Sequence, residues 1–156
     1  MRIARYYCPE AQTTYSLLPD CLAGRLSGDL SVVEEVVAQV ERSRSIEAAA
    51  DFLRSADISL PSAVRWVRRR LIPVRAALLA IVTLMPQMFA GCSPTVWEAR
   101  KVLGTTPALV ALREVAAARL GALPPPLGFG PRVKPRRRRR EHRQQKTGPD
   151  EPAREW

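Results

Sequence analysis

The sequence predicts a mainly α-helical protein that is built around a helix-turn-helix unit of three helices. Between residues 31 and 122, apolar residues recur in several segments at the 3.6-residue period of an α-helix. Ser, Thr and Pro precede these segments and Gly follows some of them, as is typical of helix starts and stops. Strand-like patterns occur only before residue 23, and residues 123–156 are rich in proline and basic side chains.

Composition indicates one domain of ordinary size with a polyanionic partner. The 156 residues are 46% hydrophobic and carry 25 basic and 15 acidic side chains, a net charge of +10. Residues 1–130 hold 15 basic and 11 acidic side chains, and residues 131–156 hold 10 and 4. The first part is therefore mildly basic and the second strongly basic, which favours nucleic acid as the partner.

The sequence contains no recognisable catalytic, metal-binding or phosphate-binding motif. Cys8, Cys21 and Cys92 are widely spaced, form no CxxC pair and cannot complete a disulfide framework. The single histidine, His142, lies in the basic stretch, so the rest of the chain can form no Ser-His-Asp or Cys-His site. Phosphate-binding glycine motifs are absent. No signal peptide pattern follows Met1. We therefore expect a cytoplasmic, nucleoid-associated protein without enzymatic activity, metal or cofactor.

Residues 1–30 form the first expected segment. Tyr, Thr and turn formers in residues 2–22 predict one or two short strands. The sequences RYYCP at 5–9 and TYSLLP at 14–19 resemble the end of a zinc ribbon in an uncharacterised family of transposon-associated proteins. In that family a second Cys stands three residues after the first, where this chain has Ala11. The resemblance implies a degenerate ribbon in which Cys8 is an orphaned ligand.

Residues 31–122 are expected to form one helical domain, which begins with a helix over 31–42. Its valines recur at helical spacing, and Glu34, Glu35 and Glu41 are expected to face water. Ser31 is the expected N-cap, and Glu34 three residues later completes a capping box.

Two further helices make the expected helix-turn-helix over residues 45–70. Ser45 caps the first, and Ser59 caps the second with Pro61 in its first turn. The apolar stripe of the second of these helices consists of Leu60, Val64, Val67 and Leu71.

The front of the helix after Ser59 is the expected nucleic-acid interface. At about 100° per residue, side chains opposite the apolar stripe point outward, with Arg70 at the edge and Arg68 nearer the buried side. Arg can bond guanine O6 and N7, and both Arg and Ser can hold phosphates. A solvated basic face is the alternative. The expected nucleic-acid-binding residues here are Ser62, Arg65, Trp66, Arg68, Arg69 and Arg70.

The segment ISLPSAVRWV, residues 58–67, resembles the recognition helix of transposase and resolvase-type helix-turn-helix domains. The resemblance implies binding of this helix in the major groove of double-stranded DNA, with a role in transposition or in regulation of a mobile element. Residues 54–57 make the turn longer than the three to four residues that are usual in such motifs.

The most apolar stretch, residues 71–92, is too interrupted for a membrane span, which needs about 20 apolar residues. We expect a buried helix, with Pro73 breaking or kinking its junction with the preceding helix. Two more helices are expected over 93–103 and 106–120, with Trp97 in the core.

Residues 123–156 are expected to be a proline-rich linker followed by a basic tail that is disordered when free. The tail would contact phosphates with little sequence preference and strong salt dependence. Its expected nucleic-acid-binding residues are Arg136, Arg137, Arg138, Arg139 and Arg140.

Three functions remain open from the sequence. The first is a DNA-binding protein that works as a homodimer or with a transposase partner. The second is a helical interaction protein that docks a partner, or a second copy, through the apolar helix over residues 76–85. The third is RNA binding by the basic tail alone.

Overall fold

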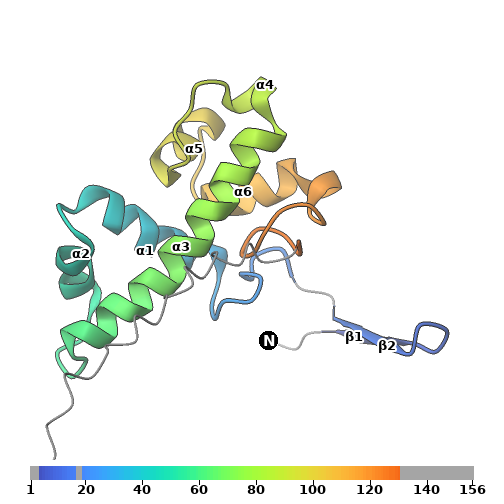
Figure 1. The fold of residues 1–156 in the computed structure, drawn as a ribbon, viewed down its shortest axis with the longest axis horizontal. Helices are drawn as coiled ribbons and strands as arrows, with labels where there is room; N and C mark the ends of the chain where they lie inside the picture. The colour runs from blue at the N-terminus through green and yellow to red at the C-terminus, as the bar shows by residue number, and fades with distance from the viewer. Residues whose placement is uncertain (1–3, 17–18, 131–156) are drawn as a thin grey trace, which may run out of the picture.

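The computed structural model describes residues 4–16 and 19–130, and their architecture is mainly helical, which confirms the predicted fold class (Figure 1). The elements are β1 (Arg5–Cys8), β2 (Thr13–Ser16), α1 (Leu30–Arg42), α2 (Ile46–Leu53), α3 (Leu60–Leu84), α4 (Pro86–Phe89), α5 (Val96–Leu103), α6 (Ala108–Val115) and the 3₁₀ turn η1 (Ala117–Arg119).

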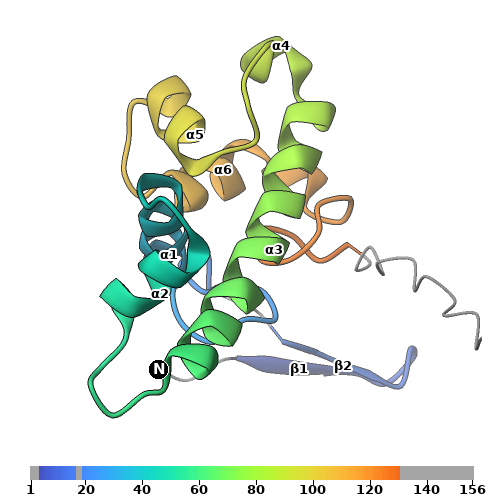
Figure 2. The same ribbon diagram turned by 60° about the vertical axis from the view of Figure 1, so that its left-hand side comes forward.

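Helix α1 lies at the centre of the fold, because it contacts α2, α3, α5 and α6. Helix α3 is the longest element and crosses the molecule, with α1 and α2 beside its N-terminal half (Figure 1). Strands β1 and β2 pair antiparallel, with Arg5 opposite Ser16 and Cys8 opposite Thr13. This hairpin extends away from the helices in both views (Figure 2). The predicted three-helix unit is thus α1–α2–α3, and the β1–β2 hairpin before it is separate.

The inner face of α3 forms much of the core. Val67, Leu71, Val74, Leu78 and Ile81 recur at helical spacing and are at most 2% exposed. The prediction that Leu60 belongs to this stripe is wrong, because its side chain is 36% exposed.

Pro73 does not break α3, the first of the two effects that the sequence predicts, since the helix runs from Leu60 to Leu84. An internal proline removes one backbone hydrogen bond and costs about 3 kcal/mol. Leu71 and Val74 flank it and are almost fully buried, and burying such a side chain contributes about 1.5–3 kcal/mol. Packing of the inner face therefore outweighs the local penalty and keeps α3 continuous.

Two glutamates of α1 hold the following helices. Glu34 is fully buried, so the prediction that it faces water is wrong. Its carboxylate accepts hydrogen bonds from Arg100 Nε at 2.7 Å and from the backbone N–H of Leu109 at 2.7 Å. Glu41, seven residues later on the same face, accepts hydrogen bonds from the backbone N–H groups of Val96 and Trp97. Glu41 and Glu34 thus satisfy orphan donors at the N-termini of α5 and α6, respectively.

These contacts explain why the predicted capping box at the start of α1 does not form. The helix begins at Leu30 with Asp29 at the N-cap, and no side chain caps it. Glu34 cannot reach back to this end because α5 and α6 occupy both of its oxygens. Glu35, which is exposed, also accepts a bond from Arg100. Burial lowers the pKa of Arg100, but its hydrogen bonds to the two glutamates and their charges outweigh this and raise it.

Trp97 is 68% exposed on α5, so the prediction that it packs in the core is wrong. The caps of α5 follow the sequence pattern more closely. Thr95 Oγ1 accepts from the backbone N–H of Glu98, and Gly104 ends the helix at φ +63°. Helix α6 ends at Val115, earlier than the predicted residue 120, and η1 continues the chain.

Residues 123–130 pack against the core, so the prediction of a linker there is wrong. Leu123 and Leu127 are fully buried. The buried guanidinium of Arg113 donates hydrogen bonds to the carbonyl groups of Pro126 and Leu127, and also to those of Asp20 and Leu22. One side chain thus fastens the segments before α1 and after η1 to each other. Desolvation by burial lowers the pKa of Arg113, although the charges of Asp20 and Cys21 oppose it.

Residues 131–156, which include the expected basic tail, lie outside the described residues. Within the described part of the chain, no helix has the length and hydropathy that a membrane span requires.

Replacing Glu34 by alanine is expected to lower the free energy of unfolding by about 3 kcal/mol, because it leaves Arg100 and the Leu109 N–H without their buried partner. The matched control is Glu35→Ala, which removes the exposed partner of the same arginine and should cost less than about 1 kcal/mol. Urea denaturation followed by circular dichroism measures both. Equal effects of the two substitutions would show that Glu34 does not hold α5 and α6.

Candidate nucleic-acid interface

The candidate interface is the outer face of the N-terminal half of α3. Arg65 and Arg69 are exposed and lie one turn apart, on the side opposite the buried Val64 and Val67. Residues four positions apart on a helix are neighbours on its surface. Burial of the inner face therefore fixes these two guanidinium groups outward, as the sequence predicts.

A short chain of polar side chains orders the beginning of this face. Ser59 Oγ donates to Ser62 Oγ at 3.0 Å, and Arg65 Nη2 donates to the same Ser62 oxygen at 3.2 Å. Ser59 is the N-cap residue of α3, but its side chain makes no bond to the helix backbone. Ser62 is therefore near the interface, and its hydroxyl positions Arg65.

Arg68 also lies at the candidate interface, but its guanidinium forms an ion pair with α2. The prediction that it points nearer the buried side is wrong, because its side chain is 54% exposed. Its Nη2 donates to Glu47 of α2 at 3.2 Å, and Glu47 is equally exposed. An exposed ion pair of this kind contributes only about 0–1 kcal/mol, so a phosphate can replace the carboxylate.

Arg70 does not belong to the interface, contrary to the sequence prediction. It is 9% exposed and its guanidinium stacks on the ring of Trp66, 3.9 Å from the centroid. Its Nη1 and Nη2 donate to the Trp66 carbonyl and to Ser27 Oγ, while Nε has no partner among the described residues. Desolvation by burial lowers the pKa of Arg70. This arginine is structural, since it joins α3 to the loop before α1.

Trp66 is 38% exposed and so lies at the margin of the outer face. One side of its ring is covered by Arg70. Trp66 therefore reaches solvent at an edge of the interface and is held rigid by the stack.

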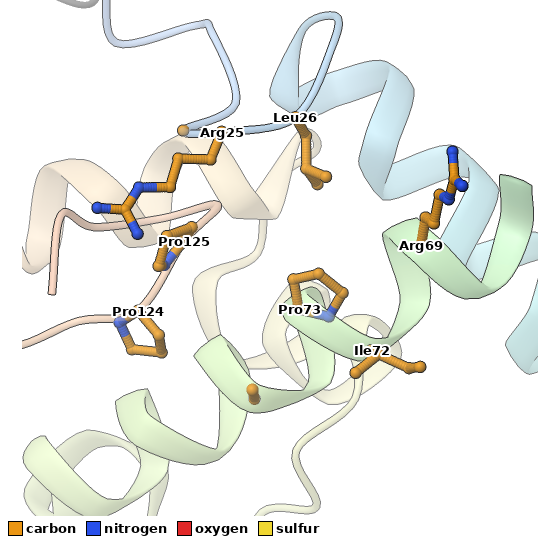
Figure 3. A pocket seen from close by; sticks show the side chains of 9 residues that line it. Arg25, Leu26, Arg69, Ile72, Pro73, Pro124 and Pro125 are labelled. Atoms are coloured by element: carbon orange, nitrogen blue, oxygen red, sulfur yellow. The ribbon is translucent and has the colours of Figure 1, made fainter. Parts of the chain in front are cut away.

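Sequence reasoning missed Arg25, which lines the same groove as Arg69. The two arginines line one groove with the middle of α3 and with Pro124 and Pro125 (Figure 3). Arg25 adopts φ +59°, a left-handed conformation that is uncommon for a residue other than glycine. No periodic signal in residues 19–28 could reveal this, because the position of Arg25 depends on contacts with residues a hundred positions later.

The structure does not unite all the predicted binding residues. Arg136, Arg137, Arg138, Arg139 and Arg140 lie outside the described residues. Within the described residues, no group of three His, Cys, Asp or Glu side chains could hold a metal ion. Cys8, which the resemblance makes a former zinc ligand, sits in the hairpin and is unpaired, as are Cys21 and Cys92.

Replacing Arg70 by alanine is expected to lower the free energy of unfolding by about 1–2 kcal/mol, because the variant has neither the stack on Trp66 nor the bond to Ser27. The matched control, Arg69→Ala one position earlier, should change it by less than about 0.5 kcal/mol. Urea denaturation measures both variants. A larger effect of the Arg69 substitution would contradict the separation of structural and interface arginines on α3.

Three comparisons with known proteins bear on identity. No family model matches the chain, and neither a curated protein nor a solved structure matches it.

Proposed function

We propose that this chain is a DNA-binding protein of the helix-turn-helix type, without chemistry of its own, that places the N-terminal half of α3 in the major groove of double-stranded DNA. The observation that carries the proposal is the pair of exposed guanidinium groups of Arg65 and Arg69 on the face of α3 opposite its buried stripe. Two outward arginines one turn apart can contact neighbouring bases along one groove.

The dimensions of α3 support this proposal. Residues 60–70 span about 16 Å at 1.5 Å per residue, and the major groove, about 12 Å wide, admits an α-helix. Helix α2 packs against α3, and in helix-turn-helix proteins the helix that precedes the recognition helix crosses the DNA backbone.

We assign different parts of the binding energy to different residues. Arg65 and Arg69 would contact base edges, and Ser62 would position Arg65. Arg68 would exchange Glu47 for a phosphate. The arginines at 136–140 would contact phosphates without reading sequence. The role in transposition or regulation of a mobile element, with a transposase partner or as a homodimer, rests on the resemblances of residues 5–19 and 58–67.

A second candidate is a helical protein-interaction module, which the remaining outer face of α3 favours. Past Arg69 this face carries exposed apolar side chains, with Ile72 66% exposed and Leu79 57% exposed on either side of the exposed Arg75. Met88 of α4 is also exposed. Large exposed apolar groups along one helix are typical of a surface that packs against another protein. This module would leave Arg65 and Arg69 as a solvated basic face.

The double substitution Arg65→Ala and Arg69→Ala is expected to weaken duplex binding at least tenfold and to change which sequences a random duplex pool yields. The matched control is Arg44→Ala with Lys101→Ala, which removes the same charge from exposed positions away from α3. A gel shift at several salt concentrations measures affinity. Unchanged duplex binding by the α3 variant would remove the recognition-helix proposal, and elution of the purified protein as a stable complex with another protein would favour the interaction module.

Replacing Arg136, Arg137, Arg138, Arg139 and Arg140 by glutamine should have a different effect. All duplexes should bind more weakly and by a similar factor, because phosphate contacts carry no sequence information. The slope of log affinity against log salt should fall in magnitude by about 0.9 for each phosphate that the variant no longer neutralises. Equal affinity of the unaltered chain for any polyanion would instead indicate binding by the tail alone.

A further inference from the structure

A groove of about 440 Å³ runs beside the outer face of α3, and the proposed function does not use it. The loop 24–26 forms one wall together with Pro124 and Pro125, and α3 around Pro73 and Ala76 forms the floor (Figure 3). Its volume lies in the range of ligand-binding sites, and most of its lining is apolar.

The groove is built into the fold by contacts outside it. Arg113 fastens the two segments that form its wall, since it donates to the carbonyl groups of Leu22 and Pro126. The backbone N–H of Gly24 donates to the Pro126 carbonyl at 2.9 Å, and this close approach leaves little space for a larger residue at position 24. The loop 24–26 and the proline segment are therefore fixed to each other as one wall of the groove.

The charged side chains that line the groove are both positive. Arg25 and Arg69 stand on either side of it, with Leu26 and Pro73 between them (Figure 3). Among the described residues that line it, none is acidic. Neither guanidinium has a hydrogen-bond or ion-pair partner within the described part of the chain. An apolar channel between two such arginines is complementary to a ligand that carries carboxylates on both sides of an apolar anchor.

We propose that residues 150–156 of this chain, DEPAREW, bind in this groove, with the Trp156 indole against the apolar floor and the acidic side chains of Asp150, Glu151 and Glu155 on the arginines. This segment carries three of the four acidic residues after position 130 and the only aromatic one. It therefore has the composition that the groove requires, unlike the basic stretch before it.

The path of the chain also favours this occupant. The described fold ends at Gly130, whose N–H bonds to the Leu123 carbonyl next to the Pro124 wall. The 19 residues from 131 to 149 can span at most about 60 Å, far more than the groove requires. Binding within one molecule gives the segment an effective concentration of the order of millimolar, so even a weak contact would be populated.

The consequence of this inference rests on the proposed function. Arg69 would serve both the DNA and the acidic segment, so the two ligands would compete for it. The chain would mask its own interface, and a duplex would have to displace residues 150–156.

Peptide binding tests the inference without DNA. A labelled, amidated peptide of residues 147–156 is titrated onto the full-length Trp156→Ala protein, in which the internal competitor is weakened, and fluorescence anisotropy is recorded. We expect saturable binding that weakens at least fivefold with Arg25→Gly, a substitution that removes the guanidinium and suits φ +59°. The control Arg44→Ala should leave the affinity unchanged, and a peptide with Asp150, Glu151 and Glu155 replaced by their amides should bind at least fivefold more weakly. Absent binding, or equal affinity for Arg25→Gly, would overturn the inference.

A second readout separates this inference from the proposed function. If the segment masks the interface, Trp156→Ala should bind duplex several-fold more tightly than the unaltered chain. Peptide binding with the expected Arg25 dependence, in a protein that ignores duplex, would support the groove assignment and contradict DNA binding. Duplex binding without peptide binding would leave the proposed function standing and overturn this inference. Mixing experiments at several protein concentrations show whether the segment acts within one molecule, as proposed, or between two copies, which would contradict it.

Discussion

Burial of one face of α3 along its whole length is the constraint on which the rest of this structure depends. The stripe from Val64 to Ile81 is covered by the helices that precede and follow α3, and its packing is strong enough to carry the helix through Pro73. A helix with one face fixed inward must present the other to solvent. That other face is basic near Arg65 and Arg69, and farther along the helix it carries the exposed apolar side chains of Ile72 and Leu79 around Arg75.

Polar side chains, rather than apolar ones, set the positions of the remaining segments. Glu34 and Glu41 of α1 bond the first turns of α6 and α5, and Arg113 bonds carbonyl groups of the two segments that form one wall of the groove. Buried charges are expensive to desolvate and persist only when their hydrogen-bonding groups are satisfied. Each of these three side chains has several partners, which makes it a specific connector between segments that the core alone would leave free to slide.

The sequence predicted those features that depend on local patterns. The cap of α2 at Ser45 and the outward direction of Arg65 follow from spacing and from residue type. Its errors at Glu34 and Arg70 involve distant partners: Glu34 meets Arg100, 66 positions later, and Arg70 meets Ser27, 43 positions earlier. Residues 123–130 were predicted to be a linker because nothing in their composition shows that the carbonyl groups of Pro126 and Leu127 accept hydrogen bonds from Arg113. Tertiary contacts overrode local preference at each of these sites.

The central claim is that α3 enters the major groove, and protection of guanine N7 tests it most directly. The full chain would select a duplex from a random pool, and the bound duplex would be treated with dimethyl sulfate, which methylates guanine N7 in the major groove. An arginine that bonds O6 and N7 blocks this reaction. The account predicts that one or more guanines of the selected duplex become protected when the protein binds. Retention of the duplex with every guanine N7 still reactive would contradict it, because the protein would then hold the DNA without placing α3 against the bases.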